Sequence, residues 1–169
     1  MTQARTLSDI GFSGGGKVLQ AVVANKVDTF SLTTNVTTFT DVTGLSVQIT
    51  PSATTSRILV TGALVCSAQN HFVYARLMRD STQVVIPTSV GNRTLANFGF
   101  GTYQASTYMP QTIPIHALDS PSSTSQLTYK IQIHAYSGNV HVNITERDNN
   151  GAGYDMRGCS TICVMEIGA

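Results

Sequence analysis

The sequence predicts an all-β protein, built as an antiparallel sandwich or barrel of about eight to ten short strands. Three observations support this prediction. Apolar and polar residues alternate with a period of two along most of the chain, as in half-buried strands. Turn residues interrupt the alternation roughly every 8–12 residues. No segment places its apolar residues at the spacing of an amphipathic helix, so helices are not expected.

Composition narrows the class of protein. The chain has 169 residues, of which 41% are hydrophobic and only 11% charged, while 23 Thr and 16 Ser fill many of the polar positions. The net charge of +1 argues against a nucleic-acid-binding surface. No apolar run is long enough to span a membrane, and the first residues lack the apolar core of a secretory signal. So few charges suggest that other subunits cover much of the surface.

The first 16 residues stand apart from the rest. They end in Gly14–Gly16, which we interpret as a flexible hinge. We therefore divide the chain into a short extended N-terminal arm, residues 1–16, and a β-sandwich domain, residues 17–169. The arm contains three apolar residues that it is too short to bury, so we expect them to anchor it to another protein or to dock on the domain. They are Leu7, Ile10 and Phe12.

Five strands are expected in the first half of the domain. Residues 18–23 are rich in β-branched side chains. Residues 45–50 alternate apolar and polar side chains, so one face of that strand is buried. Residues 58–66 are apolar on both faces and are expected to form a central strand. Residues 72–78 and 84–86 flank a tight turn and are expected to pair as a hairpin.

The middle of the chain has a different character. Residues 89–107 mix glycine with aromatic residues and show no clean alternation, which predicts a long loop. Aromatic rings offer rigid apolar faces, so this loop could bind a glycan or a partner, or else pack on the domain or a neighbouring subunit. Pro110 and Pro114 place the next strand at a sheet edge or at its own start. The aromatic candidates are Phe98, Phe100 and Tyr103.

The second half of the domain shows the clearest alternation. Residues 127–136 and 140–145 alternate around the turn Ser137–Asn139, which predicts a hairpin. Residues 146–158 are polar and contain glycine, as in a loop. Residues 159–167 are expected to close the chain as a final strand.

Two histidines flank the predicted hairpin turn. A two-residue loop would place His134 and His141 directly opposite each other on one face. Two imidazoles at that distance could bind a metal, so these residues are weak metal candidates. The alternative is a pair at the surface or at a subunit contact.

Residues for catalysis are scarce. The chain has two glutamates, and most of its seven aspartates lie at turn positions, where they satisfy the backbone. A nucleophile elbow, a zinc-protease motif and a phosphate-binding loop are all missing from the sequence. Cys66, Cys159 and Cys163 are interpreted as small buried thiols. We therefore expect no catalytic residues, no cofactor and no enzymatic activity.

Five stretches of the chain carry a resemblance to a known family: Gly15–Gln20, Asp41–Ser52, Ser56–Val60, Leu118–Pro121 and Ser160–Ile167. They resemble a module of virion structural proteins from tailed bacteriophages. The resemblance covers roughly Lys17 to Ala169, and the closing strand is its strongest mark. The lead-in Ala4–Gly11 is similar to the segment that precedes this module in tail-fibre proteins.

The resemblance implies a homotrimeric, jelly-roll-like β-sandwich, similar to the tumour-necrosis-factor-like fold, and no catalytic residues. It implies a structural or receptor-facing part of a virion, assembled in the host cytoplasm. The expected partners are further copies of the chain, other tail or capsid proteins and a glycan of the host surface. Three hypotheses follow: a small tail fibre or receptor-facing head module anchored by the arm, a capsid decoration (cement) protein that stabilises the head, and a carbohydrate-binding β-sandwich module.

The closing strand is our candidate for the subunit contact. It is apolar on both faces, and the chain has only three lysines with which to protect strand edges. A closed trimer would cover such edges. The predicted contact residues are Ile162, Val164 and Glu166.

Overall fold

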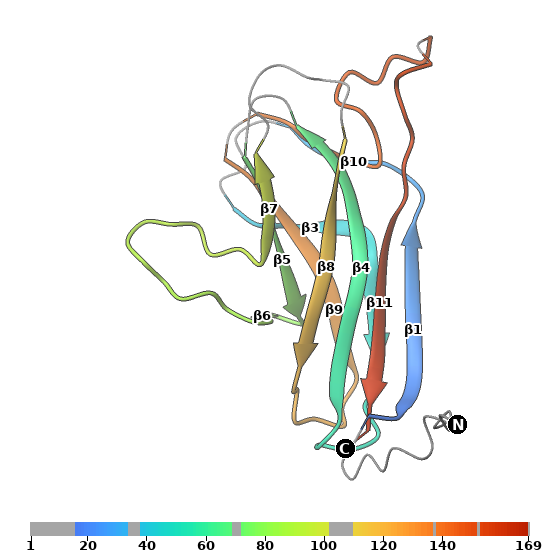
Figure 1. The fold of residues 1–169 in the computed structure, drawn as a ribbon, viewed down its shortest axis with the longest axis vertical. Helices are drawn as coiled ribbons and strands as arrows, with labels where there is room; N and C mark the ends of the chain where they lie inside the picture. Colours follow the sequence, from blue (N-terminus) through green and yellow to red (C-terminus); the bar gives the residue numbers. More distant parts are fainter. Residues whose placement is uncertain are drawn as a thin grey trace, which may run out of the picture.

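The computed structural model describes residues 16–33, 38–68, 72–101, 110–136, 138–151 and 153–168. Within these ranges the chain forms eleven strands and no helix, and the strands make two antiparallel sheets packed face to face (Figure 1). The expected all-β sandwich is therefore confirmed, with one strand more than foreseen. The strands are β1 (Val18–Lys26), β2 (Phe30–Leu32), β3 (Thr40–Ile49), β4 (Arg57–Ala68), β5 (Phe72–Arg79), β6 (Thr82–Gln83), β7 (Phe98–Gly101), β8 (Gln111–Asp119), β9 (Leu127–Ala135), β10 (Val140–Val142) and β11 (Ser160–Ile167).

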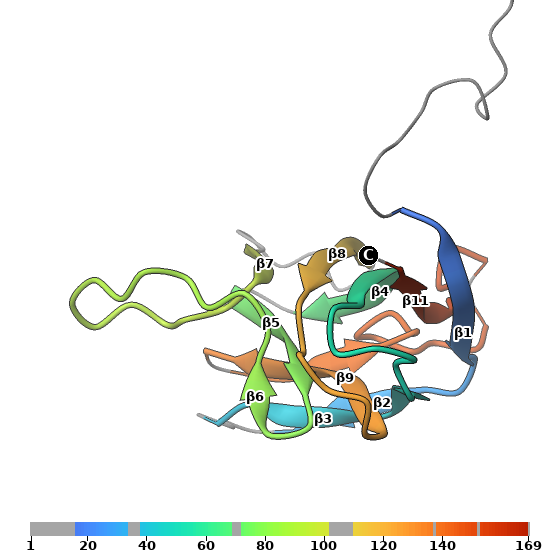
Figure 2. The same ribbon diagram turned by 90° about the horizontal axis from the view of Figure 1, so that it is seen from below.

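The strand order is that of a jelly roll. In the first sheet β11 lies between β1 and β4, and β8 lies along the other edge of β4. The second sheet has the order β3-β9-β5, followed by β7 along β5. Eight strands remain when the short strands β2, β6 and β10 are left out. Counted along the chain, the first, eighth, third and sixth of these eight lie side by side in the first sheet. The second, seventh, fourth and fifth lie side by side in the second sheet. Figure 2 shows the two layers from below.

The core lies between the two sheets because the alternation turns every second side chain inward. Along β11 the side chains alternate strictly between buried and half-buried. Leu64 from β4 and Ile131 and Ile133 from β9 are fully buried in this interior. Pro114 lies in β8, which pairs with β4 on one side only, as expected of a proline in an edge strand.

One buried tyrosine links the two sheets. The Tyr129 hydroxyl on β9 donates a hydrogen bond of 2.6 Å to Asp119 Oδ2 at the end of β8. Arg79 on β5 forms an ion pair with the same carboxylate. Burial, together with the neighbouring Asp119 carboxylate, raises the pKa of Tyr129. The hydroxyl therefore stays a neutral donor at physiological pH, and the buried polar atom is satisfied.

The hairpin after β5 is shorter than the sequence suggests. Residues 84–86 were expected to pair with β5, but the ladder contains only Met78 with Gln83 and Arg79 with Thr82, followed by a single bond from Val84 N to Leu77 O. At Val85 the backbone takes a φ of +53°, a strained value for a β-branched residue, and the chain leaves the sheet. The stretch 84–97 then projects from the side of the sandwich (Figures 1 and 2).

The expected long loop at 89–107 contains a strand. β7 spans Phe98–Gly101 and pairs with β5, with Phe98 and Phe100 half-buried and the intervening glycines exposed. The alternation is therefore present, but glycine rather than a polar residue occupies its outward positions. This is why the pattern could not be recognised as period two.

The predicted hairpin between residues 127–136 and 140–145 is wrong. β9 belongs to the second sheet, whereas β10 pairs with β4 and β2 in the first sheet. The chain crosses from one sheet to the other at the turn. Alternation alone does not distinguish these cases, because Val140 and Val142 bury their side chains in the same core from the opposite side.

Asn143 joins four segments just after β10. Its Nδ2 donates to Lys26 O at 2.8 Å and to Asp28 O at 2.9 Å, and its Oδ1 accepts from Ser160 Oγ at 2.7 Å. Its backbone N–H donates to Val65 O at 2.9 Å. The residue is fully buried and has a φ of +63°, a conformation that Asn tolerates better than most residues. It therefore fixes the start of β11 against β1 and β4.

We expect Asn143→Ala to lower the free energy of unfolding by about 2–4 kcal/mol, because two buried carbonyls and one hydroxyl lose their partner. Chemical denaturation monitored by circular dichroism measures the change. The control is Asn25→Ala, which removes one exposed hydrogen bond with Thr161 and should cost about 0.5 kcal/mol or less. Equal losses in the two variants would contradict the role assigned to Asn143.

Candidate functional site

The three residues predicted for the subunit contact face the interior of a single chain. Ile162, Val164 and Glu166 lie on β11 between β1 and β4, and each is at most 1% exposed. Their part in a subunit contact stays a prediction. The opposite face of β11, which another chain could reach directly, carries half-buried side chains such as Cys163 and Met165.

Glu166 is a buried carboxylate that holds a turn in place. Its Oε1 accepts hydrogen bonds from the Ser52 backbone N–H and hydroxyl at 2.7 and 2.6 Å and from Ser56 Oγ at 2.7 Å. Its Oε2 accepts a bond of 2.7 Å from Gln20 Nε2 on β1. Burial pushes the pKa of Glu166 upward, but these donors outweigh burial and hold it at about 2. The residue therefore has a structural role in fixing the end of β11.

We expect Glu166→Gln to lower the free energy of unfolding by about 3 kcal/mol at pH 7, because the charge-assisted bonds weaken and the new amide group faces the amide of Gln20. The stability that Glu166 contributes is present above its ordinary pKa of 4.5 and is lost as the pH falls toward about 2. Urea denaturation from pH 7 to pH 2 measures both effects.

In this titration the Glu166→Gln variant should lack the component lost between pH 4.5 and 2 in the native protein. The exposed Asp80, replaced by Asn, is a control that removes a carboxylate without touching the Glu166 cluster. Parallel acid curves for the native protein and Glu166→Gln would show that the Glu166 carboxylate does not carry this stability.

The outer face of the first sheet, made by β1, β11, β4 and β8, is aliphatic and nearly free of charge. Val23 and Leu118, at its two sides, are 53% and 46% exposed. No Asp, Glu, Lys or Arg lies in the three rows that cross its four strands. The rows are Ala21, Met165, Leu59 and Leu118; Val23, Cys163, Thr61 and His116; and Asn25, Thr161, Ala63 and Pro114. A contiguous surface of this kind is typical of protein–protein contacts.

The outer face of the second sheet is polar by comparison. On β3, Asp41 accepts hydrogen bonds from Lys130 Nζ at 2.7 Å and from Gln132 Nε2 at 2.6 Å, both on β9. Arg76 on β5 donates to Gln132 Oε1 at 2.7 Å. The two faces of the sandwich therefore differ in chemistry, and the first is better suited to burial against another copy.

The predicted aromatic loop is not exposed as expected. Phe98 and Phe100 are half-buried on β7 and pack against the core, so they offer little surface to a ligand. Tyr103 lies outside the described residues, as do the arm residues Leu7, Ile10 and Phe12.

The two histidines do not form a pair, because they belong to different sheets. His134 on β9 is buried, 5.3 Å from the Phe39 ring and 5.8 Å from the Tyr74 ring between centroids. His141 on β10 is opposite Ser67 on β4. Within the part of the chain that the structure describes, no group of three or more His, Cys, Asp and Glu side chains could hold a metal ion.

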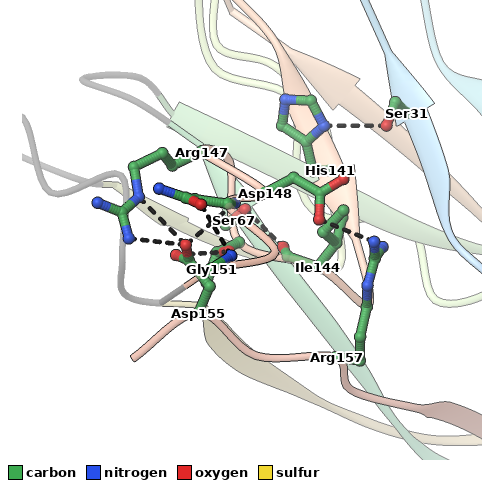
Figure 3. Close-up of polar contacts among 11 residues, drawn as sticks. Ser31, Ser67, His141, Ile144, Arg147, Asp148, Gly151, Asp155 and Arg157 are labelled. Carbon is green, nitrogen blue, oxygen red and sulfur yellow. Dashed lines mark hydrogen bonds and ion pairs between the residues drawn. The ribbon is translucent and has the colours of Figure 1, made fainter. Parts of the chain in front are cut away.

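The polar stretch 144–158 is held together by ion pairs (Figure 3). Asp155 accepts bonds from Arg147 Nη2 at 2.7 Å, from Thr145 Oγ1 at 3.1 Å and from Asn149 N at 3.0 Å. The bonds from Arg147, supported by the others, lower the pKa of Asp155. Asp148 pairs with Arg157 at 2.8 Å. Because an arginine pairs with each of these two aspartates, we assign Asp148 and Asp155 a role in holding this stretch together.

His141, Ser31 and Asp148 have the composition of a hydrolytic triad without its arrangement. Ser31 Oγ lies 2.9 Å from His141 Nδ1, as Figure 3 shows. Burial lowers the pKa of His141, while the Asp148 charge raises it in part. In a triad the carboxylate orients the imidazole through a hydrogen bond, whereas the Asp148 carboxylate is held by Arg157. We assign the cluster a structural role.

The cysteines correct one expectation. Cys66 is buried, and burial raises its pKa to about 12, so it is an inert thiol. Cys159 is exposed and Cys163 is half-buried on the outer face of the first sheet, so neither is the buried thiol expected. The described residues include no helix long and apolar enough to cross a membrane.

No protein-family model and no curated protein matches the chain. Solved structures do match. A structure of the infectious bursal disease virus Gx strain has a TM-score of 0.43 and 15% identity, covering 88% of this chain and 39% of that one. T=1 particles derived from the same virus give 0.45 and 14%, covering 98% and 42%. Its VP2 subviral particle gives 0.43 and 14%, covering 98% and 46%. The chain spans less than half of the length of these chains.

Proposed function

We propose that this protein is a non-enzymatic structural protein of a tailed-phage virion. In this proposal it forms a homotrimer that serves as a small tail fibre or a receptor-facing head module, and its arm, residues 1–16, anchors it to the particle. The observation that carries the proposal is the outer face of the first sheet, which is largely apolar and has no charged residue in the three rows that cross its four strands. The sequence resemblance to tailed-phage virion modules supports the same assignment.

The chemistry of this face favours further copies of the same chain as its occupant. Its exposed apolar side chains, such as Leu19 and Val23, would be removed from water on assembly. The three rows that cross its four strands contain no charged residue, so identical copies would not repel one another there. Closed cyclic assembly also covers the edges of β1 and β8, which pair on one side only among the described residues.

The positions of the chain ends support an anchored module. Gly16 N donates to Gly168 O, and Gly168 N donates to Lys17 O, so the start and end of the described chain lie together. Figure 1 shows both at one end of the sandwich, next to the start of β1 and the end of β11. An arm that attaches there leaves the opposite end of the module facing away from the particle.

Light scattering of the purified full chain tests the trimer. We expect three times the mass of one chain, which is 18.0 kDa for the full chain, and a trimer of correspondingly smaller mass when residues 1–16 are removed. Val23→Lys combined with Leu118→Lys should give a monomer, because the two lysines place charge on the proposed contact. The monomer should stay folded and keep a cooperative melting transition, because both side chains are exposed in a single chain. Gln48→Lys, on the exposed outer face of the second sheet, is the matched control and should leave the trimer intact.

A native chain that is monomeric at all concentrations would contradict the trimer and favour the carbohydrate-binding module. A trimer unaffected by the double lysine variant would place the contact elsewhere. Binding of the purified trimer to phage heads rather than tails would identify a capsid decoration protein in place of a fibre.

A further inference from the structure

A chain of aromatic rings crosses the outer face of the second sheet. Arg76 lies 4.2 Å above the Phe39 ring, and the contacts continue from Phe39 through His134 and Tyr74 to Phe72. The last contact joins Phe72 to Tyr136, just past the end of β9. The sequence predicts a strand over residues 72–78, which contains Phe72 and Tyr74, but the strand pattern does not indicate which rings from other strands lie beside them.

Three of these residues form a surface that we call the aromatic platform: Phe72, Tyr74 and Tyr136. The Phe72 and Tyr74 rings are nearly parallel, with planes 13° apart and centroids 6.4 Å apart. Tyr136 stands at 80° to Phe72, with centroids 6.5 Å apart. Phe72 is 54% exposed and Tyr136 is 67% exposed. The platform therefore consists of two nearly parallel rings and a third ring, Tyr136, that stands almost perpendicular to Phe72.

Two glycines on β7 have no side chains and so leave space for the two parallel rings. Gly101 is opposite Phe72 in the sheet, and Gly99 is opposite Tyr74. A Cβ atom at Gly101 would lie 2.7 Å from two atoms of the Phe72 ring, and one at Gly99 would lie 3.3 Å from the Tyr74 ring. A side chain at Gly101 would thus displace the Phe72 ring. The Phe72 and Tyr74 rings therefore occupy space that side chains at these two positions of β7 would fill.

The neighbourhood of the platform is polar and not aliphatic. Arg76 follows Tyr74 on the same face of β5, and it is hydrogen-bonded to Gln132, which is bonded in turn to Asp41. Aromatic faces next to hydroxyl, amide and charged groups match a sugar, which presents an apolar C–H face and a rim of hydroxyls. A protein partner of the kind proposed for the first sheet would need aliphatic surface, which is found on that other face.

We propose that the aromatic platform binds a neutral hexopyranose glycan. The parallel rings of Phe72 and Tyr74 stack on the apolar face of a sugar unit, Tyr136 contacts its edge, and the tyrosine hydroxyls hydrogen-bond to its hydroxyl groups. The start of β5 and the end of β9, which carry Phe72 and lead to Tyr136, lie at the end of the sandwich opposite the start of β1 and the end of β11 (Figure 1). It is also on the sheet that the proposed trimer leaves exposed, so the site does not depend on assembly.

The test uses surface plasmon resonance of the full chain over an immobilised panel of neutral oligosaccharides with gluco, galacto, manno and N-acetylated units. We expect binding to at least one class. Phe72→Ala and Tyr136→Ala should each weaken it at least tenfold with no loss of melting temperature, since both rings are exposed. Gly101→Ala should weaken it without removing a ring. The matched control is Tyr154→Ala, which removes a 65% exposed tyrosine from another part of the surface.

Three outcomes would overturn the proposal: no binding to any neutral glycan, binding that survives Phe72→Ala combined with Tyr136→Ala, or binding that is lost equally in Tyr154→Ala. The same measurement on the variant carrying Val23→Lys and Leu118→Lys separates this proposal from the trimer. Glycan binding by a single chain supports the platform whether or not the chain assembles.

Discussion

The placement of β11 between β1 and β4 is the constraint on which the rest of the fold depends. The last strand of the chain must enter the middle of a sheet whose neighbours come from its first half. Buried polar residues fix it at both ends. Asn143 and Ser160 hold its start against β1 and β4, and Glu166 holds its end against the turn that carries Ser52 and Ser56. Because these bonds are directional and shielded from water, they select this register in a way that interchangeable aliphatic contacts do not.

This constraint also determines how the surfaces are used. Because its inward side chains are buried in the core, β11 shows the solvent only its opposite face. The three rows that continue this face onto β1, β4 and β8 contain no charged residue. The second sheet carries its charges and amides outward instead, around Asp41 and Gln132. In an assembly of several copies, the largely apolar face would be buried against other copies and the polar face would stay exposed to solvent. The chain's low charge is therefore unevenly distributed, which composition alone does not show.

The class of fold could be predicted because alternation with a period of two survives in almost every long strand. Three features could not. β7 was missed because glycine fills its outward positions, and β9 and β10 were paired wrongly because alternation does not say which sheet receives a strand. The burial of Glu166 could not be foreseen either, because its four hydrogen-bond donors come from segments that are distant in the sequence. The spacing of Phe72 and Tyr74 does indicate that their rings lie on one face of the sheet, because residues two apart on a strand share a face.

The two ends of the sandwich have different tasks for a topological reason. In this strand order the first strand begins where the last one ends, so both ends of the described chain meet at one pole, as the Gly16–Gly168 hydrogen bond shows. The opposite pole lies far from both ends of the described chain (Figure 1). There the end of β9 and the start of β5 bring Tyr136 beside Phe72, and the glycines of β7 leave space above the sheet. If the arm anchors the chain at the first pole, as proposed above, the aromatic rings are presented at the end of the sandwich away from the anchor. The proposed anchor and the proposed glycan site are therefore compatible within one chain.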